Sequence, residues 1–224
     1  MFKIAHRGST LKTYISNGET HYLKFPENSL LSYLNAIEDK FDMIEADIQY
    51  TKDNILIMFH DNYIQSQKIN NLTYQDILKI NNDIITLDTF CNEVLPFIKV
   101  IFDIKGNKKT AELLVRFLEN NDISLKNAYF SSFNRYHLEI LNEYDSNLTL
   151  GVIYDGTLVD KEKLLLIQLF NIKFVSIWWE NLEDSEIDFY RQKNIKVFTW
   201  TNKTYKDYRY INKKVDGIIS DYLF

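Results

Sequence analysis

Residues 43–61 read MIEADIQYTKDNILIMFHD, and this stretch decides the fold. Its first part, Met43–Gln49, is apolar and rich in residues that favour strands, and Ile55–Phe59 is a second such run. The polar residues that separate the two runs have the chemistry of a tight reversal. We therefore predict one buried strand followed by an antiparallel extension. Glu45 and Asp47 lie two positions apart in this strand, so their side chains share one face.

Short apolar runs of this kind recur along the chain, with amphipathic stretches between them. The apolar runs predict strands over Phe2–Ala5, Met43–Gln49, Ile55–Phe59, Lys99–Ile104, Ala128–Phe130, Leu148–Ile153, Lys173–Ile177, Lys196–Thr199 and Gly217–Ile219. The amphipathic stretches predict helices over Glu27–Glu38, Leu87–Val94, Lys108–Asn120, Arg135–Glu143, Lys161–Phe170, Ser185–Lys193 and Thr204–Lys213. Because strands and helices alternate, we expect parallel strands joined by crossover helices.

The run Ile55–Phe59 extends the second strand, which leaves eight βα units along the chain. Eight units in 224 residues indicate an α/β fold, a (β/α)8 TIM barrel, formed as a single domain over residues 1–224. An open doubly wound sheet of the flavodoxin type is the alternative, although such sheets commonly have fewer strands. The polar stretches Ser9–Lys24 and Asn62–Asp83 are predicted excursions from the barrel, the second of them small and placed after strand two.

Composition narrows the classes of protein to consider. The formal charge of −5 argues against nucleic-acid binding by phosphate neutralisation. Cys91 is the only cysteine, which excludes an intrachain disulfide and fits a reducing compartment. No run of about 18 apolar residues occurs and no signal peptide is recognisable. We therefore expect a cytoplasmic protein without stable membrane insertion, and make no prediction of its oligomeric state.

Reactive groups in a (β/α)8 enzyme lie at the carboxyl ends of the strands. The side chains found at or just after predicted strand ends are His6, Arg7, Glu45, Asp47, His60, Asp61, Asp103, Lys105, Trp178, Trp179, Trp200 and Asp221. Trp200 is predicted to form an apolar wall for the alcohol part of a substrate, whereas packing is favoured for Trp178 and Trp179. Asp61 is interpreted as an orienting group, and Asp221 is left out of the predicted site.

The residue types at these ends suit phosphodiester cleavage. Glu45, Asp47 and Asp103 offer hard oxygen ligands to one Mg²⁺ or Ca²⁺ ion, and they suit zinc less well. The cations of Arg7 and Lys105 can hold an anion at the same place. Three carboxylates, one divalent ion, two cations and one bound phosphodiester sum to zero charge. Lys105 has the alternative of a structural ion pair with Asp103.

Two imidazoles complete the predicted site. Cleavage of a phosphodiester needs a base for the nucleophile and an acid for the leaving alkoxide, and His6 and His60 suit both tasks near neutral pH. The other two histidines are interpreted as structural. His21 lies in a polar stretch, and His137 is predicted to lie on the surface of a helix.

Several segments carry a family resemblance, and they occur in the family's order over nearly the whole chain. They are His6-Arg7-Gly8, Pro26-Glu27-Asn28-Ser29, Glu45-Ala46-Asp47, Thr51-Lys52-Asp53, His60-Asp61, Asp103-Ile104-Lys105, Trp200-Thr201-Asn202 and Asp216-Gly217-Ile218-Ile219-Ser220-Asp221. This set resembles the glycerophosphodiester phosphodiesterase family, within the phosphatidylinositol phospholipase C-like phosphodiesterase superfamily. Three features depart from the family pattern. Asp103 stands where the family usually has Glu, as in the related sphingomyelinase D group, the stretch between Gly8 and Pro26 is longer, and the segment after Asp61 is shorter.

The resemblance implies a (β/α)8 barrel that hydrolyses glycerophosphodiesters to an alcohol and glycerol 3-phosphate. It implies acid–base roles for His6 and His60, and attack on phosphorus by the glycerol 2-hydroxyl to give a cyclic intermediate that water opens. It also implies metal ligation by Glu45, Asp47 and Asp103, and phosphate contacts from the two cations, Arg7 and Lys105.

Three rival functions stay open at this point. A phospholipase D-like lyase acting on a lipid or polymer phosphodiester fits Asp103, although the mostly polar 9–24 stretch favours a small soluble substrate. Glycoside hydrolysis by two carboxylates needs no metal and gives the histidines and cations no task. A non-catalytic binding protein can share the same fold.

Overall fold

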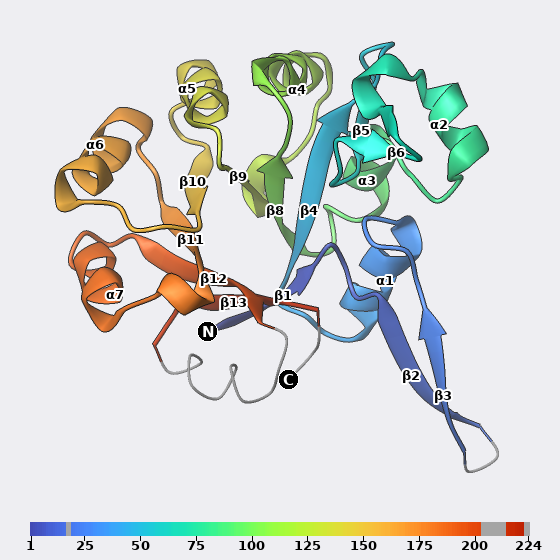
Figure 1. The fold of residues 1–224 in the computed structure, drawn as a ribbon, viewed down its shortest axis with the longest axis horizontal. Coiled ribbons are helices and arrows are strands. Elements are labelled where there is room, and N and C mark those ends of the chain that lie inside the picture. Colours follow the sequence, from blue (N-terminus) through green and yellow to red (C-terminus); the bar gives the residue numbers. More distant parts are fainter. Residues whose placement is uncertain (17–18, 203–213, 222–224) are drawn as a thin grey trace.

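The protein is described by a computed structural model that covers residues 1–16, 19–202 and 214–221. Eight parallel strands form its centre: β1 (Phe2–His6), β4 (Met43–Tyr50), β8 (Lys99–Ile104), β9 (Ala128–Ser132), β10 (Thr149–Tyr154), β11 (Phe174–Trp178), β12 (Lys196–Asn202) and β13 (Gly217–Ser220). Each strand pairs with the next, and β1 pairs with both β13 and β4, so the sheet closes. The predicted TIM barrel is confirmed, and the open doubly wound sheet is excluded (Figure 1).

The stretch 43–61 folds as predicted. Strand β4 is buried along its whole length, and β5 (Leu56–Met58) pairs antiparallel to its carboxyl end, with Ile48 opposite Met58. This extension returns the chain to the rim of the barrel, where residue 60 follows. The reversal therefore brings two candidate site segments of the sequence to one face of the fold.

Helices surround the barrel (Figure 1): α1 (Leu30–Glu38), α3 (Leu87–Glu93), α4 (Lys108–Asn120), α5 (Arg135–Tyr144), α6 (Asp160–Phe170) and α7 (Asp184–Arg191). The predicted helix over Thr204–Lys213 lies outside the described residues. Helix α1 begins at Leu30 and not at Glu27 as predicted. Asn28 has a positive φ of 55°, and the Ser29 side chain accepts a hydrogen bond from the Ser32 N–H, which makes Ser29 the N-cap.

Both predicted excursions contain regular structure. Residues 9–24, expected as a polar loop, form the hairpin β2 (Leu11–Ser16) and β3 (Glu19–Lys24), which extends away from the barrel (Figure 1). The excursion after strand two holds β6 (Tyr63–Ile64), β7 (Gln67–Lys68), the 3₁₀ turn η1 (Ile69–Asn71) and α2 (Tyr74–Ile80). Two further 3₁₀ turns are η2 (Leu125–Asn127) and η3 (Trp179–Asn181).

Large side chains fill the barrel below the site. Ile4, Met43, Ile101, Phe174, Phe198 and Ile219 pack as one buried cluster. Phe174 leans so far across the interior that a Cβ on Gly151 would lie 2.3 Å from its ring. Only glycine fits at position 151. Apolar side chains therefore fill the interior of the barrel, and the polar groups lie at the carboxyl ends of the strands. Among the described residues, no helix is long and apolar enough to cross a membrane.

Candidate active site

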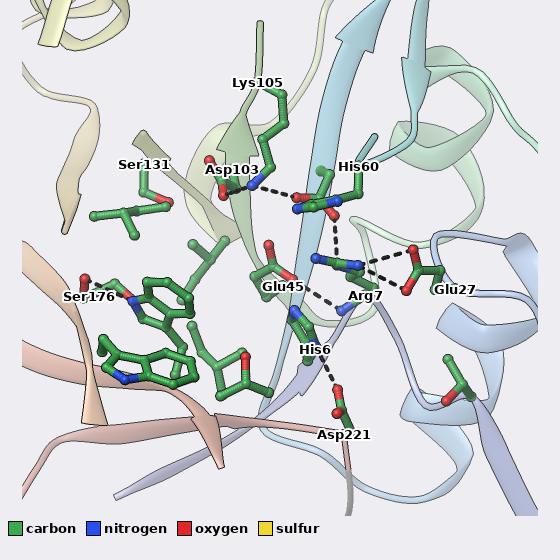
Figure 2. Close-up of a pocket in the computed structure, with 18 of the residues that line it drawn as sticks. His6, Arg7, Glu27, Glu45, His60, Asp103, Lys105, Ser131, Ser176 and Asp221 are labelled. Carbon is green, nitrogen blue, oxygen red and sulfur yellow. Dashed lines mark hydrogen bonds and ion pairs between the residues drawn. The ribbon is translucent and has the colours of Figure 1, made fainter. Parts of the chain in front are cut away.

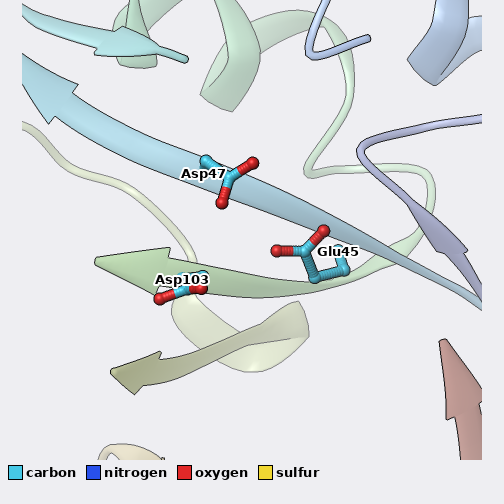
Figure 3. Close-up of side chains that lie close together, drawn as sticks. All are labelled: Glu45, Asp47 and Asp103. Carbon is cyan, nitrogen blue, oxygen red and sulfur yellow. The ribbon is translucent and has the colours of Figure 1, made fainter. Parts of the chain in front are cut away.

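Three carboxylates converge where β4 and β8 run side by side (Figure 3). Glu45 and Asp47 point from β4 to the same side, as their spacing predicts, and Asp103 is the direct partner of Asp47 in the sheet register. One oxygen from each side chain lies within 4.8 Å of the others. All three side chains are buried, so their charges need partners close by.

Two cations lie against these carboxylates. Arg7 Nε is 3.2 Å from Asp47 Oδ2, and Arg7 Nη1 donates to both oxygens of Glu27 at 3.0 and 2.9 Å (Figure 2). Lys105 Nζ lies 2.5 Å from Asp103 Oδ2 and 3.2 Å from Asp47 Oδ1. The ion pair of Lys105 with Asp103 is therefore present, and the same ammonium group also bridges to the carboxylate on β4.

A left-handed turn at the end of β1 sets the direction of the Arg7 backbone N–H. Arg7 has a φ of 54° and Gly8 a φ of 85°, and a Cβ on Gly8 would lie 2.5 Å from Ser32 Oγ. This tight turn aims the Arg7 N–H at Glu45 Oε2, at 3.1 Å. Glycine at position 8 is required both by the left-handed backbone and by the close approach of α1.

Asn28, which belongs to the Pro26-Glu27-Asn28-Ser29 segment of the family resemblance, is a buried positioning residue. Its Nδ2 donates to Asp47 Oδ2 at 2.9 Å, and its Oδ1 accepts from the Asp47 N–H at 3.1 Å. Tyr33 Oη donates to the same Oδ1 at 2.7 Å. The Asn28 amide therefore fixes the plane of the Asp47 carboxylate.

The two predicted histidines have matching environments. His6 Nδ1 lies 2.6 Å from Asp221 Oδ1 (Figure 2). His60 Nδ1 lies 2.7 Å from Asp61 Oδ1. A carboxylate at Nδ1 fixes the ring orientation and leaves Nε2 for a substrate. Asp61 has the orienting contact expected for it, whereas leaving Asp221 out of the site was wrong.

The remaining histidines lie outside the site. His137, predicted on a helix surface, is fully buried on the inner side of α5, with Nδ1 2.9 Å from Ser132 Oγ and Nε2 2.8 Å from the Asn107 carbonyl oxygen. The surface prediction was wrong because α5 presents this position to the barrel. Burial lowers the pKa of His137, so this imidazole is neutral and structural. His21 lies on β3 of the hairpin.

Gln49 on β4 holds the His60 segment and was not predicted. Its Nε2 donates to the carbonyl oxygens of His60 at 2.8 Å and Asp61 at 2.6 Å. Only the amide NH₂ can satisfy two carbonyl acceptors, which fixes the orientation of the Gln49 side chain.

We expect Gln49→Ala to lower kcat by about 10- to 100-fold, because a small displacement of His60, the candidate acid–base group, is costly. The KM should change little, since Gln49 does not line the cavity. Gln49→Glu has the same size but sets a carboxylate against two carbonyl oxygens, so it should lose as much activity. Steady-state kinetics test this prediction, and a Glu variant with wild-type kcat would contradict it.

Burial and neighbouring charges separate the acidities of the three carboxylates. Burial, together with the charge of Asp47, raises the pKa of Glu45 to about 8. Burial also raises the pKa of Asp103 to about 6, against the opposing effect of Lys105. For Asp47 burial acts upward too, but Lys105 and Arg7 outweigh it and lower the pKa. Without a metal ion, Glu45 is therefore the carboxylate of the cluster that takes up a proton most readily.

Loading the metal-free protein with a divalent ion at pH 7 should release about one proton, because Glu45, with its pKa of about 8, must lose its proton to ligate. The apparent affinity should rise about tenfold per pH unit between about pH 6 and pH 8 and level off above pH 8. Titration calorimetry in buffers of different ionisation enthalpy measures the released protons. A heat that is independent of buffer at pH 7 would contradict the prediction.

The predicted site residues all line one cavity of about 710 Å³ at the mouth of the barrel: His6, Arg7, Glu45, Asp47, His60, Asp103, Lys105 and Trp200. Trp200 Nε1 donates to the Ser176 carbonyl oxygen at 3.2 Å, and the Trp200 ring meets Trp178 and Phe133 edge-on. Trp178 and Phe133 line the cavity too. Trp178 therefore packs against Trp200, as expected, and also forms part of the cavity wall. Trp179 packs against the outer core as expected.

The carboxylate cluster fits a divalent cation. Asp103 Oδ1 and Asp47 Oδ1 are buried without a hydrogen-bond partner in the described part of the chain, although Lys105 Nζ is 3.2 Å from the latter. Buried carboxylate oxygens without donors are costly unless a cation compensates them. Three oxygen donors from three side chains are the ligands that hard divalent ions prefer.

A closed (β/α)8 barrel with its reactive groups at the carboxyl ends of the strands defines a TIM-barrel enzyme. The family model of the glycerophosphoryl diester phosphodiesterases matches residues 6–223. The chain therefore belongs to the glycerophosphodiester phosphodiesterase family of hydrolases, and the resemblance seen in the sequence is confirmed.

Individual relatives agree with this assignment. A glycerophosphodiester phosphodiesterase of Caldanaerobacter subterraneus subsp. tengcongensis is 26% identical over 240 residues, which cover 97% of this chain and 93% of that protein. A solved glycerophosphodiester phosphodiesterase of Thermotoga maritima has a TM-score of 0.78 at 22% identity, over 98% of this chain and 94% of that one. An Oleispira antarctica phosphodiesterase, solved in complex with the product sn-glycerol-3-phosphate, has a TM-score of 0.80 at 19% identity. The match covers 99% of this chain and 93% of that one. The structural likeness supports the fold.

Proposed function

We propose that residues 1–224 act as one domain that hydrolyses small glycerophosphodiesters to an alcohol and glycerol 3-phosphate, with one bound Mg²⁺ or Ca²⁺. The observation that carries this proposal is that His6 and His60, each with a carboxylate at Nδ1, line the same cavity as the carboxylate cluster. The product bound to the Oleispira antarctica relative supports the choice of substrate.

Glu45, Asp47 and Asp103 are the proposed metal ligands. A divalent ion there would neutralise charge on the phosphoryl oxygens and lower the pKa of the attacking hydroxyl. Arg7 and Lys105 are the proposed phosphate contacts, since both cations already lie within 3.2 Å of Asp47. Lys105 keeps its proton because Asp103 and Asp47 raise its pKa, although burial acts against them.

The two histidines supply the proton transfers. In the first step, the glycerol 2-hydroxyl oxygen bonds to phosphorus, its proton passes to one imidazole, and the leaving alkoxide takes a proton from the other. His6 fits the acid: burial acts to lower its pKa, but the hydrogen bond to Asp221 acts to raise it, and the pKa is raised overall. His60 is then the base. In the second step, water opens the cyclic phosphodiester while the two imidazoles exchange roles.

The cavity walls suit the remaining parts of the substrate. Trp200 is the proposed apolar wall for carbon atoms of the alcohol part, since its ring lines the cavity and its Nε1 is already satisfied by Ser176. An apolar wall next to a charged phosphate site excludes water from the reacting centre, which strengthens the electrostatic contacts there.

The experiment that tests this function is product analysis on a panel of glycerophosphodiesters, with and without EDTA. Metal-dependent release of glycerol 3-phosphate is the expected result. Phosphorus NMR follows the cyclic diester at the same time. Accumulation of the cyclic diester without hydrolysis would instead support the lyase alternative that Asp103 suggests, and no turnover by folded, metal-loaded protein would refute the proposal.

A further inference from the structure

The β2–β3 hairpin contributes one wall of the cavity, although most of it extends away from the barrel (Figure 1). Four residues at its base line the cavity: Thr10, Leu11, Lys24 and Phe25. The Phe25 N–H donates to the Thr10 carbonyl oxygen at 2.9 Å, which closes the base. The hairpin is inserted between Arg7 and Glu27, so both ends of this segment belong to the site.

Strand alternation gives the two faces of the hairpin different neighbours. Leu11 lies directly opposite Lys24, and both line the cavity. The next pair, Lys12 opposite Leu23, points to the other face. Lys12 forms an ion pair with Glu38 of α1, which confirms that the second face is turned towards that helix.

The cavity-facing side of the hairpin continues outwards beyond the cavity. Thr13 lies opposite Tyr22, and alternation returns this third pair to the face that carries Leu11 and Lys24. Tyr22 is 67% exposed and Thr13 is also exposed. Leu11, Thr13, Tyr22 and Lys24 therefore form a continuous surface that leads out of the cavity, which we term the hairpin ledge.

Lys24 gives this ledge an uncompensated positive charge. Among residues 1–16, 19–202 and 214–221, Lys24 has neither an ion pair nor a hydrogen bond through its ammonium group. Glu27 also lines the cavity, but both its carboxylate oxygens already accept from Arg7. An anion on the ledge would find a free cation, whereas a quaternary ammonium group would meet a like charge.

We propose that the hairpin ledge is the subsite for the outer end of the leaving alcohol, and that Lys24 favours an alcohol bearing a negative charge, such as a second phosphate. This inference rests on the proposed function, because it assigns the part of the substrate that lies beyond the scissile phosphate. A cavity of about 710 Å³ has the size of sites for ligands much larger than glycerol phosphate, so space for such an alcohol is present.

The test uses two diesters that differ only by charge: glycerophosphoglycerol, and the same diester with a phosphate on the far hydroxyl of the leaving glycerol. Wild-type kcat/KM should be about two- to fivefold higher for the phosphate-bearing diester, as for one exposed ion pair. Lys24→Met should bring the ratio to about one, and Lys24→Glu should bring it below one. About 1 M salt, with a screening length of about 3 Å, should remove the preference.

Lys126→Met is the matched control, because Lys126 is exposed in η2, which precedes β9 at the opposite end of the barrel. This variant should keep the wild-type ratio. A third substrate, a longer glycerol phosphate oligomer, distinguishes the sources of the anion. A further Lys24-dependent gain supports a polymer lying along the ledge towards Tyr22, and an equal rate supports a small anionic alcohol.

A binding measurement tests this inference independently of the proposed reaction. Calorimetry with metal-loaded His60→Ala protein measures the ratio of Kd values for the two diesters without turnover. A Lys24-dependent ratio in binding supports the ledge even where wild-type protein proves inactive. A wild-type ratio at or below one, or a ratio that Lys24→Met leaves unchanged, would overturn the proposal and direct the alcohol to the wall formed by Trp178 and Trp200.

Discussion

Replacing His60 with alanine is expected to lower kcat/KM for glycerophosphodiesters by about 10²- to 10⁴-fold, with the fold retained. The imidazole supplies a proton transfer that water in the cavity supplies poorly. Its side chain is about one-third exposed and contacts Asp61, so its loss leaves no void in the core. A coupled assay for glycerol 3-phosphate measures the rate, and a melting temperature within a few degrees of wild type verifies the fold.

His6→Ala should show a loss of similar size on natural diesters, but the two variants should differ on an activated substrate. A 4-nitrophenyl ester of glycerol phosphate needs little protonation of its leaving group. If His6 is the acid, His6→Ala recovers much of its activity on this ester and His60→Ala does not. His21→Ala is the control, because His21 lies on β3 and does not line the cavity. Equal rates for His60→Ala and His21→Ala would contradict the assignment.

The barrel was predictable because its signal is local and repeated. Each apolar run between amphipathic stretches became a strand, and the helix over Lys108–Asn120 begins and ends where the sequence predicts. The carboxyl ends of parallel strands meet at one face, so Glu45 and Asp103 could be placed together without knowing any contact.

The hairpin was missed for a physical reason. Its strands bury little, as the mostly exposed β3 shows, so no apolar face appears in the sequence. The Asn17-Gly18 dipeptide was the available signal, since this pair is the strongest short-range indication of a tight hairpin turn. Composition alone therefore indicated a polar loop where paired strands occur.

Partners of the site side chains were missed because they depend on closure of the barrel. Asp221 is 215 positions from His6, and only the pairing of β1 with β13 brings the two together. Asn28 reaches Asp47 because the backbone before α1 turns left-handed. Such contacts arise from tertiary structure, and no spacing rule in one sequence predicts them.

Two carboxylates of the same cluster should respond oppositely when they are neutralised in metal-free protein. Asp47 is 1% exposed and compensates both Arg7 and Lys105. Asp47→Asn removes this charge from two half-buried cations that keep Glu27 and Asp103 as partners, so the free energy of unfolding in EDTA should fall by about 1–3 kcal/mol. Glu45→Gln replaces a group whose pKa is raised to about 8 and removes the cost of protonating a carboxylate that is ionised in the unfolded chain, so it should raise stability at pH 7.

The difference in stability between Glu45→Gln and wild type should depend on pH. Folding raises the pKa of Glu45 from 4.5 to about 8, so the folded protein binds the extra proton and loses stability as pH rises between those values. Glu45→Gln removes that loss, and its stability relative to wild type in EDTA should increase from about pH 5 to pH 8. Denaturant unfolding measures both effects, and Glu119→Gln, at an exposed position of α4, is the control. Both Asp47→Asn and Glu45→Gln should abolish the metal-dependent rate, because each removes one of only three carboxylates in the cluster. A Glu45→Gln protein destabilised as strongly as Asp47→Asn would show that Glu45 is ionised in the folded protein and that its charge, like that of Asp47, is compensated.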